Sequence, residues 1–232
     1  MNDDDMTLTD RAYGSLREDI LNGVLAPGVR LRLDPLKARY GMGASPLREA
    51  LSRLAGDGFV IAEGRRGFSV PPVSLSELHD VTESRVMIET LALRCSLEQS
   101  ARTDPHGWEA GIVASFYRLS KLDDQLTAHQ PTAEWELRHA DFHEALIRAC
   151  PLQRILHFRQ ILFEQSERYR RLSLSQLPLD RDVPGEHRAL MEAVLERQAD
   201  RACELLAAHI RRTGHIVAEA VRGMNGRGAL VG

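Results

Sequence analysis

Several features that would point to other classes of protein are missing from this 232-residue sequence. It has only three cysteines, Cys95, Cys150 and Cys203, and each is isolated in a segment with a helical pattern, which indicates buried free thiols. No apolar run approaches the length of about 18 residues that a membrane-spanning helix needs, and no signal peptide is visible. We therefore expect a soluble, cytoplasmic protein with no membrane association.

Motifs of common enzymes are missing as well. The sequence contains neither a nucleophile elbow nor a phosphate-binding loop. It also has no internal repeat, and its only low-complexity feature is the acidic run from Asp3 to Asp5. We expect the tail that contains this run, residues 1–7, to be disordered.

Charge is distributed unevenly along the chain, although the formal net charge is only −3. Residues 1–72 contain ten Lys or Arg and ten Asp or Glu, and three of these acids form the run in the tail. Without that run the segment has a net charge of +3, whereas residues 73–232 have a net charge of −3. A basic first part joined to an acidic second part fits DNA contact at one end of the chain.

The stretch from Asp34 to Leu54 predicts a helix-turn-helix. Asp34 is placed to cap a short helix, with Pro35 at its first position and Gly41 just past its end. A second helical pattern starts a few residues later and consists of Leu47, Ala50, Leu51 and Leu54. Two helices joined by so short a turn cross steeply, and the second one then lies in the DNA major groove. Its candidate DNA contacts are Ser45, Arg48 and Arg53.

Segments on both sides of this stretch complete a winged helix. A helix is expected before it, from about Thr9 to Asn22. After it, FVIAEGRRGFSV has the turn chemistry of a hairpin, with Arg65, Arg66 and Gly67 at the tip. The two arginines either contact DNA from the wing or belong to a solvated loop.

The chain after Pro71-Pro72 predicts an all-α domain. These prolines stiffen the chain and predict a boundary between domains 1–72 and 73–232. Ser74 and Glu77 form a capping box that opens a helix to about Ser100. Further helices are expected at roughly 105–128, 132–149, 151–174, 183–197 and 200–222. The predicted fold is therefore mainly α: a winged helix-turn-helix followed by an antiparallel bundle of about six helices.

Four histidines of the second domain form a candidate metal site. His139 and His143 are spaced i, i+4 and project from one face of one helix. His187 and His209 each lie about eleven residues, or roughly 16 Å, from the turn between the last two helices, so an antiparallel hairpin places them at the same level. Four converging imidazoles would suit zinc, nickel or a similar divalent ion. The alternative is that each is a surface or hydrogen-bonded core histidine.

A metal raises the alternative of a metal-dependent hydrolase with an appended winged helix. Metallopeptidases of the HExxH type place a glutamate directly after the first histidine to activate water, but Ala140 stands there in this chain. Asp141 points to the opposite side of the helix, about 200° around. We therefore expect a protein that is not an enzyme.

One larger pattern runs through both domains. YGM…SPLREALSRL…GFV…RRGFSV is followed by a histidine pair of the form HxxFH and later by EHRALMEAV…D…A…H. This order resembles the GntR family of bacterial transcription regulators, and within it the FadR-type branch with an FCD ligand-binding domain, over roughly residues 8–222. The resemblance implies a homodimer that binds a palindromic operator in double-stranded DNA. It also implies a bundle that binds a small organic acid, often beside a metal, and thereby alters DNA affinity. We expect a repressor.

Two positions depart from the family pattern. The family usually begins the recognition helix with Ser-Arg-Thr-Pro, and this chain has Gly43-Ala44-Ser45-Pro46. The missing arginine makes Arg48 relatively more important for DNA. The family usually has Asp or Asn four residues before the second histidine of the pair, where this chain has His139, a neutral and softer ligand.

The family often has an arginine on the first bundle helix that faces the ligand. Arg85 fits this position, and its planar guanidinium matches a carboxylate. It is either an effector-binding residue or a surface partner of Glu89 at i, i+4. Arg168, Tyr169 and Arg170 are further candidates that helical phase does not separate.

Overall fold

The computed structural model describes residues 6–123, 132–173 and 181–228. The chain is mainly helical and divides into two compact units. The first unit contains Met1–Glu77 and Glu164–Ser173, and the second contains Leu78–Phe163 and Leu174–Gly232. None of the helices in the described part is long and apolar enough to cross a membrane.

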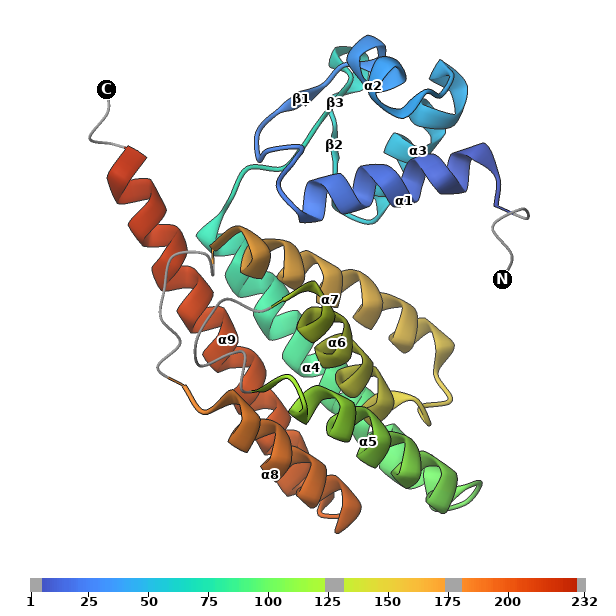
Figure 1. Ribbon diagram of the computed structural model, residues 1–232, viewed down its shortest axis with the longest axis vertical. Helices are drawn as coiled ribbons and strands as arrows, with labels where there is room; N and C mark the ends of the chain where they lie inside the picture. The colour runs from blue at the N-terminus through green and yellow to red at the C-terminus, as the bar shows by residue number, and fades with distance from the viewer. Residues whose placement is uncertain (1–5, 124–131, 174–180, 229–232) are drawn as a thin grey trace. The chain divides into compact units, whose positions relative to one another are not determined.

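The first unit contains the predicted winged helix-turn-helix (Figure 1). Its helices are α1 (Leu8–Leu21), α2 (Leu33–Tyr40) and α3 (Ala44–Gly56). Three short strands, β1 (Arg30–Leu31), β2 (Ile61–Ala62) and β3 (Phe68–Ser69), form an antiparallel sheet in the order β1-β3-β2. The wing is therefore the β2-β3 hairpin, and a 3-10 turn, Gly64–Arg66, forms its tip.

Apolar side chains at helical spacing hold the three helices together. The four leucine and alanine positions predicted for the recognition helix are all fully buried in one core: Leu47, Ala50, Leu51 and Leu54. Leu16 and Ile20 of α1 belong to the same core. α1 begins at the N-cap Thr7, whose hydroxyl accepts a hydrogen bond from the Asp10 amide at 3.1 Å.

One detail of the predicted helix-turn-helix is wrong. Asp34 does not cap α2, because the helix begins at Leu33, two residues earlier than predicted, and Arg32 occupies the N-cap without a side-chain hydrogen bond. Asp34 lies instead in the first turn, where its carboxylate pairs with Lys37 at 2.6 Å and faces the positive end of the helix dipole. The predicted end is confirmed, since Gly41 adopts φ 63° and its amide bonds the Lys37 carbonyl.

All six predicted bundle helices are present, as Figure 1 shows. They are α4 (Leu75–Ser100), α5 (Pro105–Ser120), α6 (Ala133–Ile147), α7 (Gln153–Ser173), α8 (Val183–Leu195) and α9 (Ala199–Gly228). α5 ends eight residues before the predicted residue 128, and residues 124–131 lie outside the described part. α8 and α9 meet at the turn that the sequence predicts near Gln198-Ala199.

Side-chain caps and a common core define these helices. Asp104, Thr132 and Asp182 each accept a hydrogen bond from the backbone amide three residues later, at the start of α5, α6 and α8. One face of α6 is buried, and it presents Trp135, His139, Phe142, His143 and Leu146 to the interior. The two histidines therefore occupy core positions of the helix.

Candidate functional site

The exposed face of α3 carries a free arginine. Ser45 and Arg48 are both exposed, and the guanidinium of Arg48 forms no hydrogen bond or ion pair with any residue that the structure describes. Arg48 lies in the second turn of α3, close to the end that faces base edges in a helix-turn-helix. This side chain is available for a base or a phosphate.

The other predicted DNA contacts differ in their surroundings. Arg53, in the last turn of α3, contacts α1. Its Nη1 lies 3.0 Å from the Asp10 carboxylate, and its guanidinium carbon lies 4.1 Å from the centre of the Tyr13 ring. Arg66 is exposed at the tip of the wing, and Gly67 has φ 96°, which a side chain would strain. The side chain of Arg65 lies outside the described set.

The four predicted histidines come together in the second unit. His139, His143, His187 and His209 are all buried, and one ring nitrogen of each lies within 4.8 Å of the others. The rings of His187 and His209 are 4.8 Å apart, which confirms that the α8-α9 hairpin places them at one level. Nitrogen ligands of one tetrahedral ion lie roughly 3.4 Å from one another, so the four ring nitrogens have nearly the spacing of a ligand set around one ion.

The surroundings of these imidazoles favour their neutral form. Burial first, and then the neighbouring imidazoles and arginines, lower the pKa values of His139, His143 and His187 well below the usual 6.5. Burial also lowers the pKa of His209, although Glu186 opposes this change. Neutral imidazole is the form that ligates a metal.

Several of the buried nitrogen atoms have no partner among the described atoms. They are Nδ1 of His139, Nδ1 of His143 and both ring nitrogens of His187. Leaving a buried polar group unpaired costs roughly 1–3 kcal/mol. Each ring can offer one nitrogen to an ion: Nε2 of His139 and Nε2 of His143 lie 3.1 Å apart, and both nitrogens of His187 are without a partner among the described atoms. The residues present therefore fit a divalent ion.

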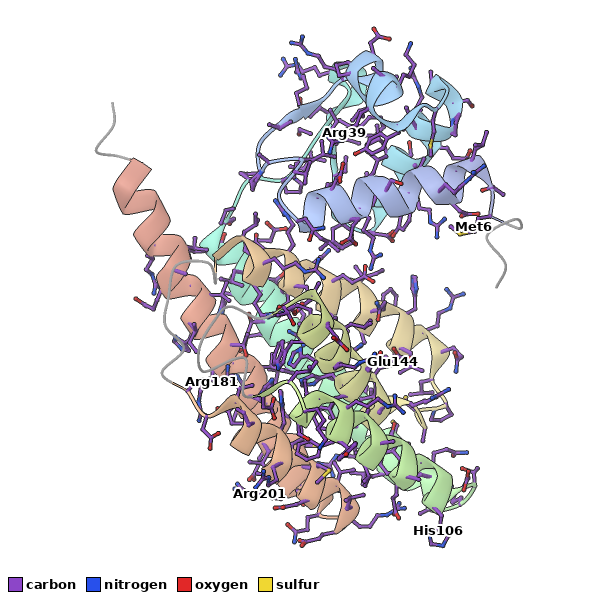
Figure 2. All side chains as sticks on the ribbon, viewed as in Figure 1. Met6, Arg39, His106, Glu144, Arg181 and Arg201 are labelled. Atoms are coloured by element: carbon purple, nitrogen blue, oxygen red, sulfur yellow. The ribbon has the colours of Figure 1, made fainter. Side chains whose placement is uncertain are left out.

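Glu186 orients His209. Its carboxylate lies 2.9 Å from Nδ1 of His209, and it is also bonded to Arg181 and Arg212. Because a carboxylate only accepts, this contact requires the proton on Nδ1 and leaves the Nε2 lone pair available. Arg181, labelled in Figure 2, has Glu186 and the His209 carbonyl as acceptors and does not need Nδ1.

Two buried arginines and one glutamate adjoin the histidines. Arg85 is 6% exposed and donates to Glu89 at 2.8 Å, and Glu89 is 1% exposed. The predicted alternative of a surface pair is therefore wrong. Glu89 also lies 3.6 Å from Nε of Arg159 on α7. Burial would raise the pKa of Glu89, but the two arginines hold it below its usual value.

The ring of Phe163 lies close to both arginines and to His143. Its ring centre lies 5.0 Å from the Arg85 guanidinium carbon, 4.3 Å from that of Arg159 and 6.4 Å from the ring centre of His143. We call the set of His139, His143, His187, His209, Arg85, Glu89 and Arg159 the buried polar centre. It combines neutral metal ligands with cations that match an anion.

Three other candidates on α7 belong to the first unit. Arg168 donates to the Pro71 carbonyl, and the Tyr169 hydroxyl donates to Glu77 at 2.6 Å, both within the first unit. Arg170 pairs with Glu167 on its own helix. Of the predicted capping box, the Ser74 hydroxyl accepts from the Glu77 amide at 3.3 Å, while the Glu77 carboxylate accepts from Tyr169.

Arg159 and Glu186 were missed by the sequence interpretation. Arg159 lies four residues before Phe163 and in phase with the apolar residues of α7, so an arginine at an apolar position was the available signal. Glu186 directly precedes the predicted ligand His187, and nothing in the sequence distinguishes it from a surface glutamate. The bond to His209 depends on the packing of α8 against α9.

Among the residues that the structure describes, no group is placed to activate water at the histidines. Ala140 follows the first histidine, and Asp141 pairs with Arg138 at 3.2 Å. Asp141 and Glu144 line a separate pocket of about 520 Å³ between α5 and α6, and Figure 2 labels Glu144 there. Glu186 and Glu89, the carboxylates that the structure does place near the rings, are each held by arginine.

The other four described histidines lie outside the cluster, as the sequence interpretation expected. His79, His157 and His215 are exposed. The His106 side chain is 95% exposed at the start of α5 (Figure 2). His129 lies outside the described residues.

The first unit is a winged helix with a free arginine on α3, and the second unit buries a set of ligand-type side chains. Together these features define a DNA-binding regulator with a ligand domain. Two family descriptions match the chain: bacterial regulatory proteins of the gntR family over residues 8–70, and the FCD domain over residues 80–212. The chain belongs to the GntR family and has the FadR-type architecture with an FCD domain. It is a transcription regulator with a DNA-binding helix-turn-helix and an effector-binding domain, and these families are regulators, not enzymes.

Similar proteins carry the same description. The chain is 40% identical to the "uncharacterized HTH-type transcriptional regulator BphR" of Paraburkholderia xenovorans (strain LB400), over 91% of this chain and 85% of that protein. It is 33% identical to the "HTH-type transcriptional repressor GlaR" of Escherichia coli (strain K12), over 94% of this chain and the full length of that protein.

The fold is similar to that of solved structures. E. coli McbR/YncC matches with a TM-score of 0.74 at 19% identity, over 92% of this chain and 98% of the other. A GntR regulator from Rhodococcus sp. RHA1 matches with a TM-score of 0.69 at 18% identity, over 91% of this chain and 98% of the other. These likenesses confirm the predicted fold.

Proposed function

We propose that this regulator is a cytoplasmic repressor that binds a palindromic operator as a homodimer and releases it when a small carboxylate binds beside a divalent metal. The name of the E. coli relative, a repressor, supports the sign of regulation. The main support for the metal is that four buried imidazoles, which favour the neutral form, lie close together. His139, His143, His187 and His209 would hold the ion, and zinc or nickel suits such a set.

The buried arginines support a carboxylate effector. Arg85 and Arg159 lie beside the histidines, and each is paired with Glu89. A bound metal supplies a positive centre on which a carboxylate oxygen can be fixed. Arg85, packed over Phe163, would orient the anion from its second side.

Coupling to DNA follows from chain connectivity. Arg85 lies on α4, which begins at Leu75, three residues after Pro71-Pro72. Tightening of α4 around a ligand changes the direction in which the chain enters this stiff linker. Two winged helices must meet half-sites at a fixed spacing, so a small rotation is enough to lose one of them.

Thermal-shift screening against organic acids tests this function, with and without a chelator. A ligand of the folded state raises the melting temperature by mass action. We expect carboxylates to raise it in metal-loaded protein and to do so much less after chelation. A screen in which uncharged analogues give the same shifts as the acids would contradict the proposal.

A further inference from the structure

A pocket of about 560 Å³ lies between the start of α8 and the first half of α9, and we call it the α8-α9 pocket. Two of the residues that line it, Ala208 and Arg212, are exposed, whereas the side chain of His209, which also lines it, is 7% exposed. His209 is the one member of the described four-histidine cluster that borders this pocket. The α8-α9 pocket therefore leads from the surface to one ligand of the proposed metal site.

His209 separates this pocket from the rest of the cluster. Its Nδ1 lies 2.9 Å from the carboxylate of Glu186, which lines the pocket. The centre of its ring lies 4.8 Å from that of His187 and 5.0 Å from that of His143, and neither of these two residues lines the pocket. One edge of the His209 ring thus faces the pocket while another faces the cluster. Rotation of this one side chain would open a path between the two.

Glu186 offers an oxygen ligand on this path. Its Oε2 bonds His209, whereas its Oε1 bonds Arg212. Arg181 also bonds this carboxylate, but its side chain is 5% exposed and is fixed by Thr213 and by the carbonyl of His209. Arg212 is 55% exposed, and an ion pair with so exposed a partner contributes little to stability. A cation can therefore replace Arg212 on Oε1 without breaking the bond that orients His209.

The charged side chains of the pocket do not exclude a cation. Two arginines, Arg181 and Arg212, are balanced there by two acids, Asp182 and Glu186. When the exposed Arg212 moves into solvent, the acids are in excess beside His209. A local excess of negative charge raises the concentration of cations at the pocket and the rate at which they arrive.

We propose that the divalent ion enters and leaves the histidine cluster through the α8-α9 pocket, where Glu186 is its first ligand and His209 turns to let it pass. This inference rests on the metal of the proposed function and adds the route by which the site is filled. Carboxylate oxygen and imidazole nitrogen are both ligands of the ions that suit the cluster, so the transfer from one to the other is favourable at each step.

Rates of nickel uptake and release by the full chain test the route. The ring of Trp135 is stacked on His139 with 4.7 Å between the ring centres, so Ni²⁺ bound at the cluster should change its fluorescence in a stopped-flow experiment. Uptake is measured by mixing metal-free protein with Ni²⁺. Release is measured by mixing loaded protein with EDTA, at concentrations where the rate no longer depends on EDTA.

Ala208→Phe places a ring in the pocket at an exposed position. We expect uptake and release to slow by the same factor, about tenfold, with Kd unchanged, because a narrowed route raises one barrier in both directions. Ala110→Phe makes the same change at an exposed position of α5 and should keep the wild-type rates. Unchanged rates in Ala208→Phe overturn the inference. Slower uptake with wild-type release also overturns it, since that result means a weakened site and not a narrowed route.

Arg212→Ala tests the role of Glu186 and decides the matter if Ala208→Phe does not fold. We expect uptake at least about threefold faster than in the wild type, because Glu186 no longer has to release an exposed arginine. Arg188→Ala removes another exposed arginine, on α8, and controls for the loss of one positive charge. Equal uptake rates in these two variants overturn the assignment of Glu186 as first ligand. A wild-type chain that binds neither Ni²⁺ nor Zn²⁺ overturns the metal of the proposed function itself.

Discussion

At the scale of single residues, four imidazoles occupy core positions where apolar side chains would stabilise the bundle without unpaired nitrogen atoms. His143 and His187 are 1% and 0% exposed, as fully buried as the leucines around them. Such a set is destabilising unless an ion satisfies it. The proposed metal site would explain why these polar residues lie in the core.

Replacing one ligand should remove the ion. We expect elemental analysis to find about one divalent ion per chain in the wild type and very little in His143→Ala, because three ligands hold an ion less tightly than four. His157→Ala, which removes an exposed histidine on α7, should retain the ion. Full metal content after replacement of His143 and His187 together would refute the site.

The lowered histidine pKa values predict how the metal-free protein responds to pH. Below the usual pKa of 6.5 each histidine gains a proton in the unfolded chain but not in the folded one, so stability is retained above pH 6.5 and lost as pH falls below it. Each buried histidine contributes at most about 1.4 kcal/mol per pH unit. We therefore expect denaturant unfolding of the chelated proteins to show that stability falls less steeply between pH 7 and 5 for His187→Ala than for the wild type. An identical pH dependence in the two proteins would be inconsistent with this account.

Arg48 should contribute strongly to the affinity for DNA. The fragment for this measurement is selected from random DNA by the wild-type protein. Arg48→Ala should weaken binding by about 1–3 kcal/mol, the scale of a good base contact. Arg102→Ala, which removes an exposed arginine of the second unit, is the control and should bind as the wild type does. Unchanged binding by Arg48→Ala would show that α3 is not the recognition helix.

At the scale of elements, the sequence predicts which helices exist better than where they begin. Leu47, Ala50, Leu51 and Leu54 predict α3 because apolar spacing reports burial directly. The start of α2 was misplaced because a capping residue and a first-turn acid look alike in sequence. The histidine cluster was predictable because helical rise converts residue spacing into distance. Arg159 was not, since its role depends on which helices face each other.

The turn between α2 and α3 depends on the conformation of Gly41. A Cβ at this position would meet nothing within 4 Å, so the cost of Gly41→Ala comes from φ 63° alone, about 1–2 kcal/mol. Gly56→Ala also faces open space, but within α3 and at negative φ, and it should be neutral or stabilising. Denaturant unfolding compares the two variants. Equal midpoints would contradict the structural role of Gly41.

At the scale of the whole molecule, helices connect the buried polar centre to the DNA-binding part of the chain. α4 carries Arg85 and begins just after the prolines of the linker. α7 carries Arg159 and Phe163 in its first half, and its last ten residues, Glu164–Ser173, belong to the first unit. A ligand bound at the buried polar centre would therefore act on two helices that continue toward the winged helix.

The central claim is that carboxylate binding and operator binding oppose each other, and reciprocal affinities test it most directly. The measurement is the affinity of metal-loaded protein for the carboxylate that binds most tightly in the screen, by calorimetry, with and without the selected DNA fragment. Linkage requires that DNA weaken effector binding by the same factor as the effector weakens DNA binding. The account predicts a factor of about 5–150, the usual range of allosteric coupling. Equal effector affinity in the two DNA states would contradict it.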